Sequence, residues 1–317
     1  MVTGKPLVTA IVIGRNQRDQ VLACLGSYLA DADTPRDAVV VDATSGDGTP
    51  EAVAAHYPAV KVVRRLAASG YGRSGNAGLS VAEGRFILLL DPAVAVQPGC
   101  VGRLADFLLT RPDAGAVGPR LDDRRADGVE RPDPAARRGF PTPSSRLYRA
   151  LALDRMLPHS RRFNGHGIGH LRATETHEID AGSGACLLVR RSAIDRVGFF
   201  DPDYSRFGED LDLCYRLKMG GWKVFYVPDA RAVRMPAQVP LEVRRRSLWD
   251  EHTSMWTFHH KHYAADLPAF ANGLVWATNW AGWGYRAARE ELQGATPNLS
   301  PPSPPTRRPA PPAPGEA

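Results

Sequence analysis

The sequence predicts an α/β fold: a mixed, mostly parallel sheet flanked by helices, with a C-terminal helical appendage. Up to about residue 118, short apolar runs alternate with amphipathic segments, which is the pattern of βαβ units. The run Phe86–Leu90 consists of five apolar residues and predicts a strand buried on both faces. Beyond Pro240 the pattern turns helical and aromatic, which predicts the appendage.

The individual elements follow from these two patterns. Short apolar runs predict strands at 8–13, 38–41, 60–63, 86–90, 115–118, within 182–190 and at 222–227. Apolar residues spaced three and four apart predict helices at 17–30, from 49, up to 83, and at 98–110, 192–197 and 207–217. Turn-forming residues separate them, notably in the turn Thr44–Gly48 and in the glycine-rich stretch Gly70–Gly78, which we expect to be a loop.

Residues 120–178 lack a clear period, and we expect a long excursion from the sheet that acts as a lid or binding segment. The predicted organisation is a main domain over 1–240, a Trp-rich helical appendage over 241–295 and a disordered tail over 296–317. The tail holds nine of the 27 prolines. The excursion contains histidines that we interpret as polar loop residues rather than metal ligands: His159, His166, His170 and His177.

The composition is that of a soluble globular protein, with 43% hydrophobic and 23% charged residues among 317. The formal net charge of +6 comes from arginines that cluster in pairs and triplets. Such clusters suit phosphate-bearing ligands or an anionic membrane surface, with scattered solvated arginines as an equal alternative. No helix-turn-helix or aromatic–basic platform supports a nucleic-acid partner. We find no signal peptide, spanning segment or disulfide pattern, and expect a cytoplasmic protein.

Two aspartates stand at the ends of predicted strands. Asp91 follows the strand 86–90, and Asp42 closes the strand 38–41. Ligands of open α/β sheets bind at the carboxyl ends of the strands, where a carboxylate can accept a hydrogen bond from a nucleobase or a ribose. Two residues after Asp91, where a second carboxylate would complete a clamp for a divalent metal, the chain has Ala93.

The stretch Gly70–Gly78 has four glycines in nine residues, together with Arg73 and Asn76. Glycines let backbone N–H groups approach a diphosphate closely. The stretch follows the third strand rather than the first and lacks the lysine of a P-loop, so a plain turn is the alternative interpretation.

Two adjacent carboxylates, Glu209 and Asp210, open the helix predicted at 207–217. Carboxylates in a first turn stabilise a helix by roughly 0.3–1 kcal/mol through its dipole. Successive helix residues point about 100° apart, so only one of the two can turn into a cleft. We interpret that one as a general base, which deprotonates a hydroxyl nucleophile.

In order and spacing, these motifs together resemble glycosyltransferase family 2 over residues 7–262, and its rhamnosyltransferase-like actinobacterial branch in particular. The motifs are the two strand-end aspartates, the glycine stretch, Gly182–Ala185, Gly198–Asp201 and Phe207–Leu213. The resemblance implies a GT-A (Rossmann-like) fold for the main domain. It also implies inverting transfer of a sugar from a UDP- or dTDP-linked donor to an acceptor hydroxyl, in cell-wall or surface polysaccharide synthesis.

Residue roles follow from the same resemblance. Asp210, with Glu209 beside it, would be the general base. Asp91 would open the motif that binds metal and diphosphate. The expected donor-binding residues are Asp42 at the nucleobase, Asp91, Gly70, Arg73, Asn76, Ser183, Gly184 and Arg234.

The chain departs from the family pattern at two positions near the expected metal: Ala93 replaces a carboxylate, and Arg234 replaces a histidine after the last strand. Alanines also replace two asparagines, at Ala43 and Ala68. A metal neutralises charge on the leaving diphosphate, and an arginine can do the same. We therefore expect either Mg²⁺ or Mn²⁺ at Asp91 or metal-independent transfer with Arg234 in the metal's place. A degenerate pseudo-glycosyltransferase that binds a nucleotide sugar or a protein is the alternative.

In the appendage, Trp276, Trp280 and Trp283 recur at helical spacing, and Arg244–Arg246 supply positive charge. Tryptophan beside basic residues is typical of a membrane interface, which suits a glycan or lipid-linked acceptor at the inner face of the plasma membrane. The alternative is that these tryptophans pack on the main domain or in a homodimer contact.

Overall fold

The computed structural model describes residues 6–30, 34–65, 70–125, 127–151, 153–157, 159–160, 162–163, 168, 171–204, 207–236 and 241–294. Its strands are β1 (Val8–Gly14), β2 (Arg36–Asp42), β3 (Lys61–Arg64), β4 (Phe86–Leu90), β5 (Val94–Val96), β6 (Ala114–Arg124), β7 (Glu130–Pro132), β8 (His177–Ile179), β9 (Cys186–Arg190) and β10 (Lys223–Arg234). Its α-helices are α1 (Arg18–Leu29), α2 (Thr49–His56), α3 (Tyr71–Val81), α4 (Cys100–Thr110), α5 (Pro143–Ala150), α6 (Leu153–Met156), α7 (Arg191–Val197), α8 (Glu209–Met219), α9 (Leu241–His262) and α10 (Ala269–Gly294). Short 3-10 helices are η1 (Pro134–Ala136) and η2 (Ala264–Asp266).

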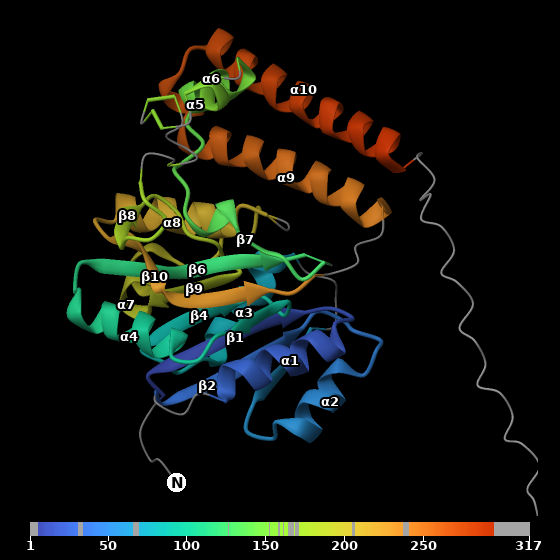
Figure 1. The fold of residues 1–317 in the computed structure, drawn as a ribbon, viewed down its shortest axis with the longest axis vertical. Helices are drawn as coiled ribbons and strands as arrows, with labels where there is room; N and C mark the ends of the chain where they lie inside the picture. Colours follow the sequence, from blue (N-terminus) through green and yellow to red (C-terminus); the bar gives the residue numbers. More distant parts are fainter. Residues whose placement is uncertain are drawn as a thin grey trace, which may run out of the picture.

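These strands form one mixed sheet with the order β3-β2-β1-β4-β9-β6-β10-β5, while β7 pairs with β6 and β8 with β10 (Figure 1). The first four strands run parallel. The strand β9 then runs antiparallel to both β4 and β6. The carboxyl ends of β1, β2 and β4 therefore meet the amino end of β9 at one edge of the sheet. The mixed α/β fold class is confirmed.

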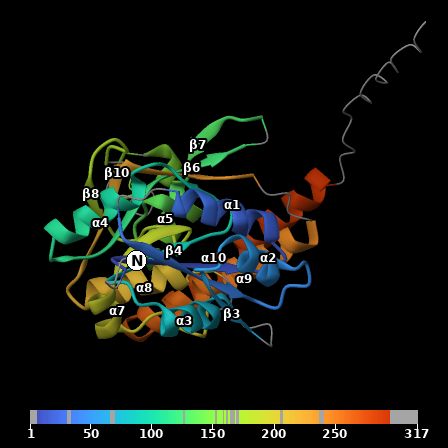
Figure 2. The ribbon, with the colours of Figure 1, turned by 90° about the horizontal axis from the view of Figure 1, so that it is seen from below.

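Helices cover both faces of the sheet because successive strand residues point to opposite sides. Val12 and Leu88 pack in a cluster with α1, α2 and α4. Their neighbours Ile11 and Leu89 pack in a second cluster with residues of α7, α8 and α9, against which α3 also packs. In Figures 1 and 2 the sheet accordingly lies between two layers of helices.

The strand and helix predictions hold in outline, with three differences. The strand β5 is a three-residue segment that pairs with β10, too short to be recognised by pattern. The start of the expected excursion continues β6 as far as Arg124, and β7 and β8 join the sheet.

The tail predicted over 296–317 lies outside the described residues.

The third difference concerns the glycine-rich stretch, for which the loop prediction was wrong: the helix α3 begins at Tyr71. Its glycines serve close packing. A Cβ at Gly75 would lie 2.5 Å from the ring of Phe200, and one at Gly78 would lie 2.7 Å from Ile11. Contacts this close require glycine, and they outweigh the roughly 1 kcal/mol that each glycine costs a helix.

The helix α9 lies between the main domain and α10 (Figure 1). Near its C-terminal end, Phe258 is fully buried in the second cluster, together with residues of α8. His262 Nε2 lies 2.8 Å from Asp212 Oδ1, and Arg216 Nε donates to Asp212 Oδ2 at 2.7 Å. Burial opposes ionisation of Asp212, but these two partners hold its pKa below the usual value. The end of α9 is thus part of the main core.

The appendage tryptophans divide between packing and exposure. Trp249 of α9 lies 4.7 Å from Trp280 and 5.4 Å from Trp283 of α10, measured between ring centroids. Trp276, on the same helix, is half exposed. Among the described helices, none combines the length and apolarity needed to cross a bilayer.

Candidate active site

The carboxyl end of β4 places Asp91 beside the small-residue turn that precedes β9. The backbone N–H of Asp91 donates to Ala185 O at 2.9 Å, which holds the turn Ser183–Ala185 alongside. Asp91 Oδ1 accepts the N–H of Ala93 at 2.8 Å. Ser183 is buried in the same turn. The antiparallel pairing of β4 and β9 thus brings together Asp91 and Ala185, which are 94 positions apart in the chain.

The N-terminus of α8 brings Asp210 to this turn. Gly208, with φ +88°, starts the helix. Asp210 Oδ2 accepts the N–H of Gly184 at 2.7 Å, and Oδ1 accepts that of Leu211 at 2.7 Å. A Cβ on Gly184 would lie only 3.0 Å from Asp210 Cβ, so the approach depends on glycine. The adjacent Glu209 is 4% exposed, against 19% for the side chain of Asp210, which makes Asp210 the more accessible carboxylate.

Tyr71, the first residue of α3, is influenced by these carboxylates, and local pattern did not single it out beyond its place among the glycines. Burial raises the pKa of its hydroxyl well above the usual value, and the negative charges of Asp91, Glu209 and Asp210 raise it further. The charges of all three carboxylates therefore act on one phenol. The first residue of α3, the end of β4 and the start of α8 converge on one site.

Arg138 is a second residue that the pattern did not single out, except as part of an arginine pair. Its backbone forms a bridge with Ala181, with N–H···O distances of 3.0 and 2.9 Å. Its Nη2 lies 2.9 Å from Asp210 Oδ1 in an ion pair. The excursion after β7 thus places a guanidinium on the candidate base.

Asp42 closes β2, two strands away from Asp91 across the sheet, a separation of about 10 Å. It is 4% exposed, and its Oδ2 accepts the N–H of Ser45 at 3.1 Å. Within the described residues, its Oδ1 has no hydrogen-bond partner. A buried carboxylate oxygen without a partner is uncommon and fits a site that receives a donor group from a ligand.

Arg234 ends β10 directly beside the Asp91 turn, because it pairs with Val94 and the next N–H donates to Ala93 O at 2.7 Å. The two positions that depart from the family pattern therefore are neighbours. The guanidinium itself is directed to Asp123 and Asp133, with Nη1 at 2.9 and 3.0 Å from their carboxylate oxygens. Both contacts use Nη1, so a diphosphate would have to be bound through Nη2 or Nε, or Arg234 would have to leave its two carboxylates.

The other expected donor-binding residues lie on or next to α3. Gly70 is its N-cap and accepts a backbone hydrogen bond from Ser74 at 3.2 Å. Arg73 is exposed. Asn76 forms two hydrogen bonds with the backbone of Phe200, at 2.8 and 3.0 Å, and so holds the segment Gly198–Asp201 against the helix. Ala68 lies outside the described residues.

A divalent metal fits this site only with help from a ligand. In the described part of the chain, no three His, Cys, Asp or Glu side chains come together to hold an ion, and His166 and His170 lie outside it. Asp91 is the carboxylate at the expected metal position. Mg²⁺ is commonly bound by one or two carboxylates together with substrate phosphates, and Asp91 fits that mode.

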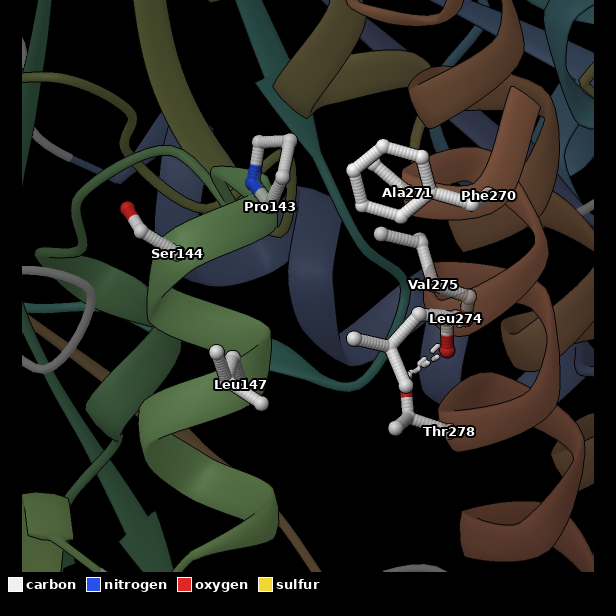
Figure 3. Close-up of a pocket in the computed structure, with 8 residues that line it drawn as sticks. All are labelled: Pro143, Ser144, Leu147, Phe270, Ala271, Leu274, Val275 and Thr278. Atoms are coloured by element: carbon white, nitrogen blue, oxygen red, sulfur yellow. Dashed lines mark hydrogen bonds between the residues drawn. The ribbon is translucent and has the colours of Figure 1, made fainter. Parts of the chain in front are cut away.

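An apolar groove of about 190 Å³ lies apart from these polar residues, between α5 and α10 (Figure 3). Leu147 of α5 faces Leu274 and Val275 of α10 across it, and Phe270 closes one end. Phe270 is 80% exposed and Leu274 49% exposed. Arg146 joins the two elements by donating to Asn279 Oδ1 at 3.2 Å. The excursion and the appendage thus share an exposed apolar surface.

Comparisons with known proteins agree on one family. The family described as "Glycosyltransferase like family 2" matches residues 6–265. The N-acetylglucosaminyl-diphospho-decaprenol L-rhamnosyltransferase of Mycobacterium tuberculosis is 31% identical over 232 residues, which cover 67% of this chain and 71% of the relative. The beta-monoglucosyldiacylglycerol synthase of Synechocystis is 30% identical over 69% of this chain and 42% of its own length.

Solved structures share the fold at low identity. A mannosyltransferase from Pyrobaculum calidifontis in complex with GDP-Man and Mn²⁺ gives a TM-score of 0.54 at 20% identity, covering 93% of this chain and 80% of the other. Residues 1–349 of Staphylococcus aureus TarS give 0.53 at 16% identity, covering 92% and 75%.

Proposed function

Because the chain belongs to glycosyltransferase family 2 and is a glycosyltransferase, we propose that it transfers a sugar, with inversion, from a UDP- or dTDP-linked donor to the hydroxyl of a glycan or lipid-linked acceptor. The observation that carries this proposal is the position of Asp210. It lies at the start of α8 and is hydrogen-bonded to Gly184, in the same turn whose Ala185 O accepts the backbone N–H of Asp91.

The proposed reaction is a single displacement. The acceptor oxygen bonds to the anomeric carbon as the bond from that carbon to the diphosphate oxygen breaks, and Asp210 takes the hydroxyl proton. The nucleoside diphosphate leaves with the electron pair of the broken bond. Attack opposite the leaving group inverts the anomeric centre. Asp42 would bind the nucleobase, and the turn Ser183–Gly184 would align acceptor and donor.

Two means of neutralising the diphosphate remain as proposals. Asp91 would hold Mg²⁺ or Mn²⁺ together with donor phosphates, and the metal would supply Lewis-acid stabilisation of the leaving group. In the competing proposal Arg234 supplies the positive charge without a metal. The position of Arg234 beside Ala93 supports the second, and its pairing with Asp123 and Asp133 opposes it.

The acceptor and location are inferred from the relatives. The mycobacterial relative is named for a diphospho-decaprenol acceptor, and the cyanobacterial one for a diacylglycerol glycolipid. The exposed apolar side chains along α5 and α10 suit contact with a bilayer that carries such an acceptor. We propose that the protein acts at the inner face of the plasma membrane through this surface.

A donor screen followed by turnover tests the function. Thermal shift with UDP-, dTDP- and GDP-sugars, with and without Mn²⁺, identifies the donor that stabilises the protein. We expect wild type to transfer or hydrolyse that donor. Asp210→Asn should bind it with similar affinity while losing at least about 100-fold in rate. Stabilisation by a donor without turnover in the presence of candidate acceptors would instead favour the pseudo-glycosyltransferase.

A further inference from the structure

The carboxylate of Asp210 has three contacts in this structure, which use both lone pairs of Oδ1 and one of the two on Oδ2. Oδ2 accepts from Gly184, and Oδ1 accepts from Leu211 and pairs with Arg138 at 2.9 Å. A general base must offer a free lone pair to the hydroxyl that it deprotonates. Of these contacts, the backbone ones are fixed by the turn and the helix. The side chain of Arg138 is the contact that can leave.

The site contains several carboxylates, so binding of a negatively charged diphosphate requires a cation that can contact the donor. The negative charges of Asp91, Glu209 and Asp210 all act on the hydroxyl of Tyr71, and a nucleoside diphosphate would add further negative charge. Arg234 is held by Asp123 and Asp133. A guanidinium binds phosphate with the same planar fork that it uses for carboxylate, so exchange of one anion for the other requires no new geometry.

We propose that Arg138 exchanges partners during the reaction: it pairs with Asp210 in the free enzyme and moves to the diphosphate when the donor binds. This inference rests on the proposed function. The exchange has two effects, because the same movement stabilises the leaving group and frees Asp210 Oδ1 for the acceptor proton. A lone pair of Oδ1 therefore becomes available to the acceptor hydroxyl once the donor is in place.

The surroundings of Arg138 permit this movement. Its backbone is fixed by the bridge to Ala181, whereas its side chain is 20% exposed. Among the described residues, its Nε has no hydrogen-bond partner. The guanidinium is thus tied to the site through one ion pair, unlike Arg216, which donates to Asp212 and also to the carbonyls of Val197 and Gly198.

The neighbouring Arg137 offers a matched control. Its Nη1 donates to Leu171 O at 2.9 Å, and its guanidinium lies 5.8 Å from the ring centroid of Tyr226. It shares the charge and chain position of Arg138 but none of its contacts with Asp210.

The test compares Arg138→Gln, Arg138→Lys and Arg137→Gln with wild type by calorimetric titration with nucleoside diphosphates and the matching monophosphates. Loss of a charged contact to the outer phosphate should weaken diphosphate binding by roughly 10- to 100-fold in Arg138→Gln, with monophosphate affinity changed less than about threefold. Arg138→Lys should recover part of the loss, and Arg137→Gln should behave as wild type. Turnover should fall in parallel with diphosphate affinity.

An unchanged ratio of diphosphate to monophosphate affinity in Arg138→Gln and Arg138→Lys would overturn the proposal. So would an equal loss for both ligands, which indicates a structural role. Circular dichroism of each variant identifies misfolding, and Arg138→Lys keeps the comparison decisive if the glutamine variant unfolds. A wild-type protein that binds no nucleoside diphosphate would refute the proposed function itself, and this inference with it.

Discussion

At the scale of single residues, the absence of one Cβ sets the position of the proposed base. Asp210 approaches the turn before β9 because residue 184 is a glycine, and the N–H of that glycine then holds the carboxylate. The same turn is held next to Asp91 because Ala185 O accepts the backbone N–H of Asp91. The proposed base Asp210 and the residue expected at the diphosphate, Asp91, are therefore linked through a few backbone atoms. This link favours accurate alignment of the base with the donor.

Gly184→Ala should reduce turnover by roughly tenfold or more, because its Cβ displaces Asp210 by a fraction of an ångström. Donor affinity and the thermal unfolding temperature should change little. Gly118→Ala is a suitable control, since a Cβ there meets its nearest neighbour at 3.6 Å, an ordinary contact. Equal turnover in the two variants would show that the alignment of Asp210 is unimportant.

Reversing the paired departure tests the arginine hypothesis. If Arg234 takes the place of the metal, wild type should retain most of its transfer rate in EDTA, and the double variant Ala93→Asp, Arg234→His should require added Mn²⁺. The variant restores a second carboxylate near Asp91 and removes the competing guanidinium. Initial rates with EDTA and with Mn²⁺ decide the matter. A wild-type enzyme silenced by EDTA would contradict the role of Arg234 and assign the metal to Asp91.

The site residues differ in how far the sequence predicts them. Asp42 and Asp91 end strands and Glu209 and Asp210 begin a helix, so local pattern is enough to place them at the active edge of the sheet. Tyr71 and Arg138 were missed, as was the pairing of Arg234 with Asp123 and Asp133. Each depends on contacts between segments distant in the chain, which no local period encodes.

At the scale of elements, tertiary contacts overrode local propensity in α3. Four glycines predict a loop, yet the helix forms because Gly75 and Gly78 admit Phe200 and Ile11 to its surface. Asn76 adds two hydrogen bonds to Phe200. Strands such as β4 were predicted correctly because burial on both faces leaves a continuous apolar run, which local sequence displays directly.

A buried histidine between α9 and α10 makes their association sensitive to pH. His259 is fully buried, and its Nε2 lies 2.8 Å from Asn272 Oδ1. The amide nitrogen of Asn272 donates to the carbonyls of Ala264 and Leu267, so its Oδ1 accepts and His259 Nε2 carries the hydrogen. Burial lowers the pKa of His259, because a second proton would place a charge in the interface.

The unfolded chain therefore binds this proton more readily than the folded one. The stabilisation is complete above the unfolded pKa near 6.5 and is lost as the pH falls toward the lower folded pKa. We expect a lower urea midpoint at about pH 5.5 than at about pH 7.5. His259→Gln, which keeps a donor for Asn272 but cannot titrate, should reduce that difference. His56→Gln, at an exposed histidine, should leave it unchanged. Equal pH dependence in both variants would contradict the assignment.

At the scale of the whole molecule, the exposed apolar side chains concentrate where the excursion meets the appendage. Leu151 and Met156 of the excursion are 59% and 72% exposed, and Phe270 and Leu274 border the groove (Figure 3). The tryptophans first suggested for membrane contact are partly used in packing α9 against α10. The apolar surface along α5 and α10 is therefore the better candidate for a bilayer contact.

Co-sedimentation with anionic liposomes tests this surface. We expect wild type to sediment with the vesicles and the double variant Phe270→Glu, Leu274→Glu to lose most of that binding, because two charges would enter the interface. Turnover on a water-soluble acceptor should persist. Leu109→Glu is a matched control, since Leu109 is 42% exposed on α4. Wild type that stays in the supernatant would end the membrane hypothesis.

The burial of Phe258 and His262 against α8 also bears on where this protein can be divided. A boundary at residue 240, where the composition changes, would remove His262, one of the two partners of Asp212, and would expose the core residues against which Phe258 packs. The family match likewise extends past residue 240, to residue 265. A truncation that is meant to leave the main core intact would therefore have to retain the last turns of α9.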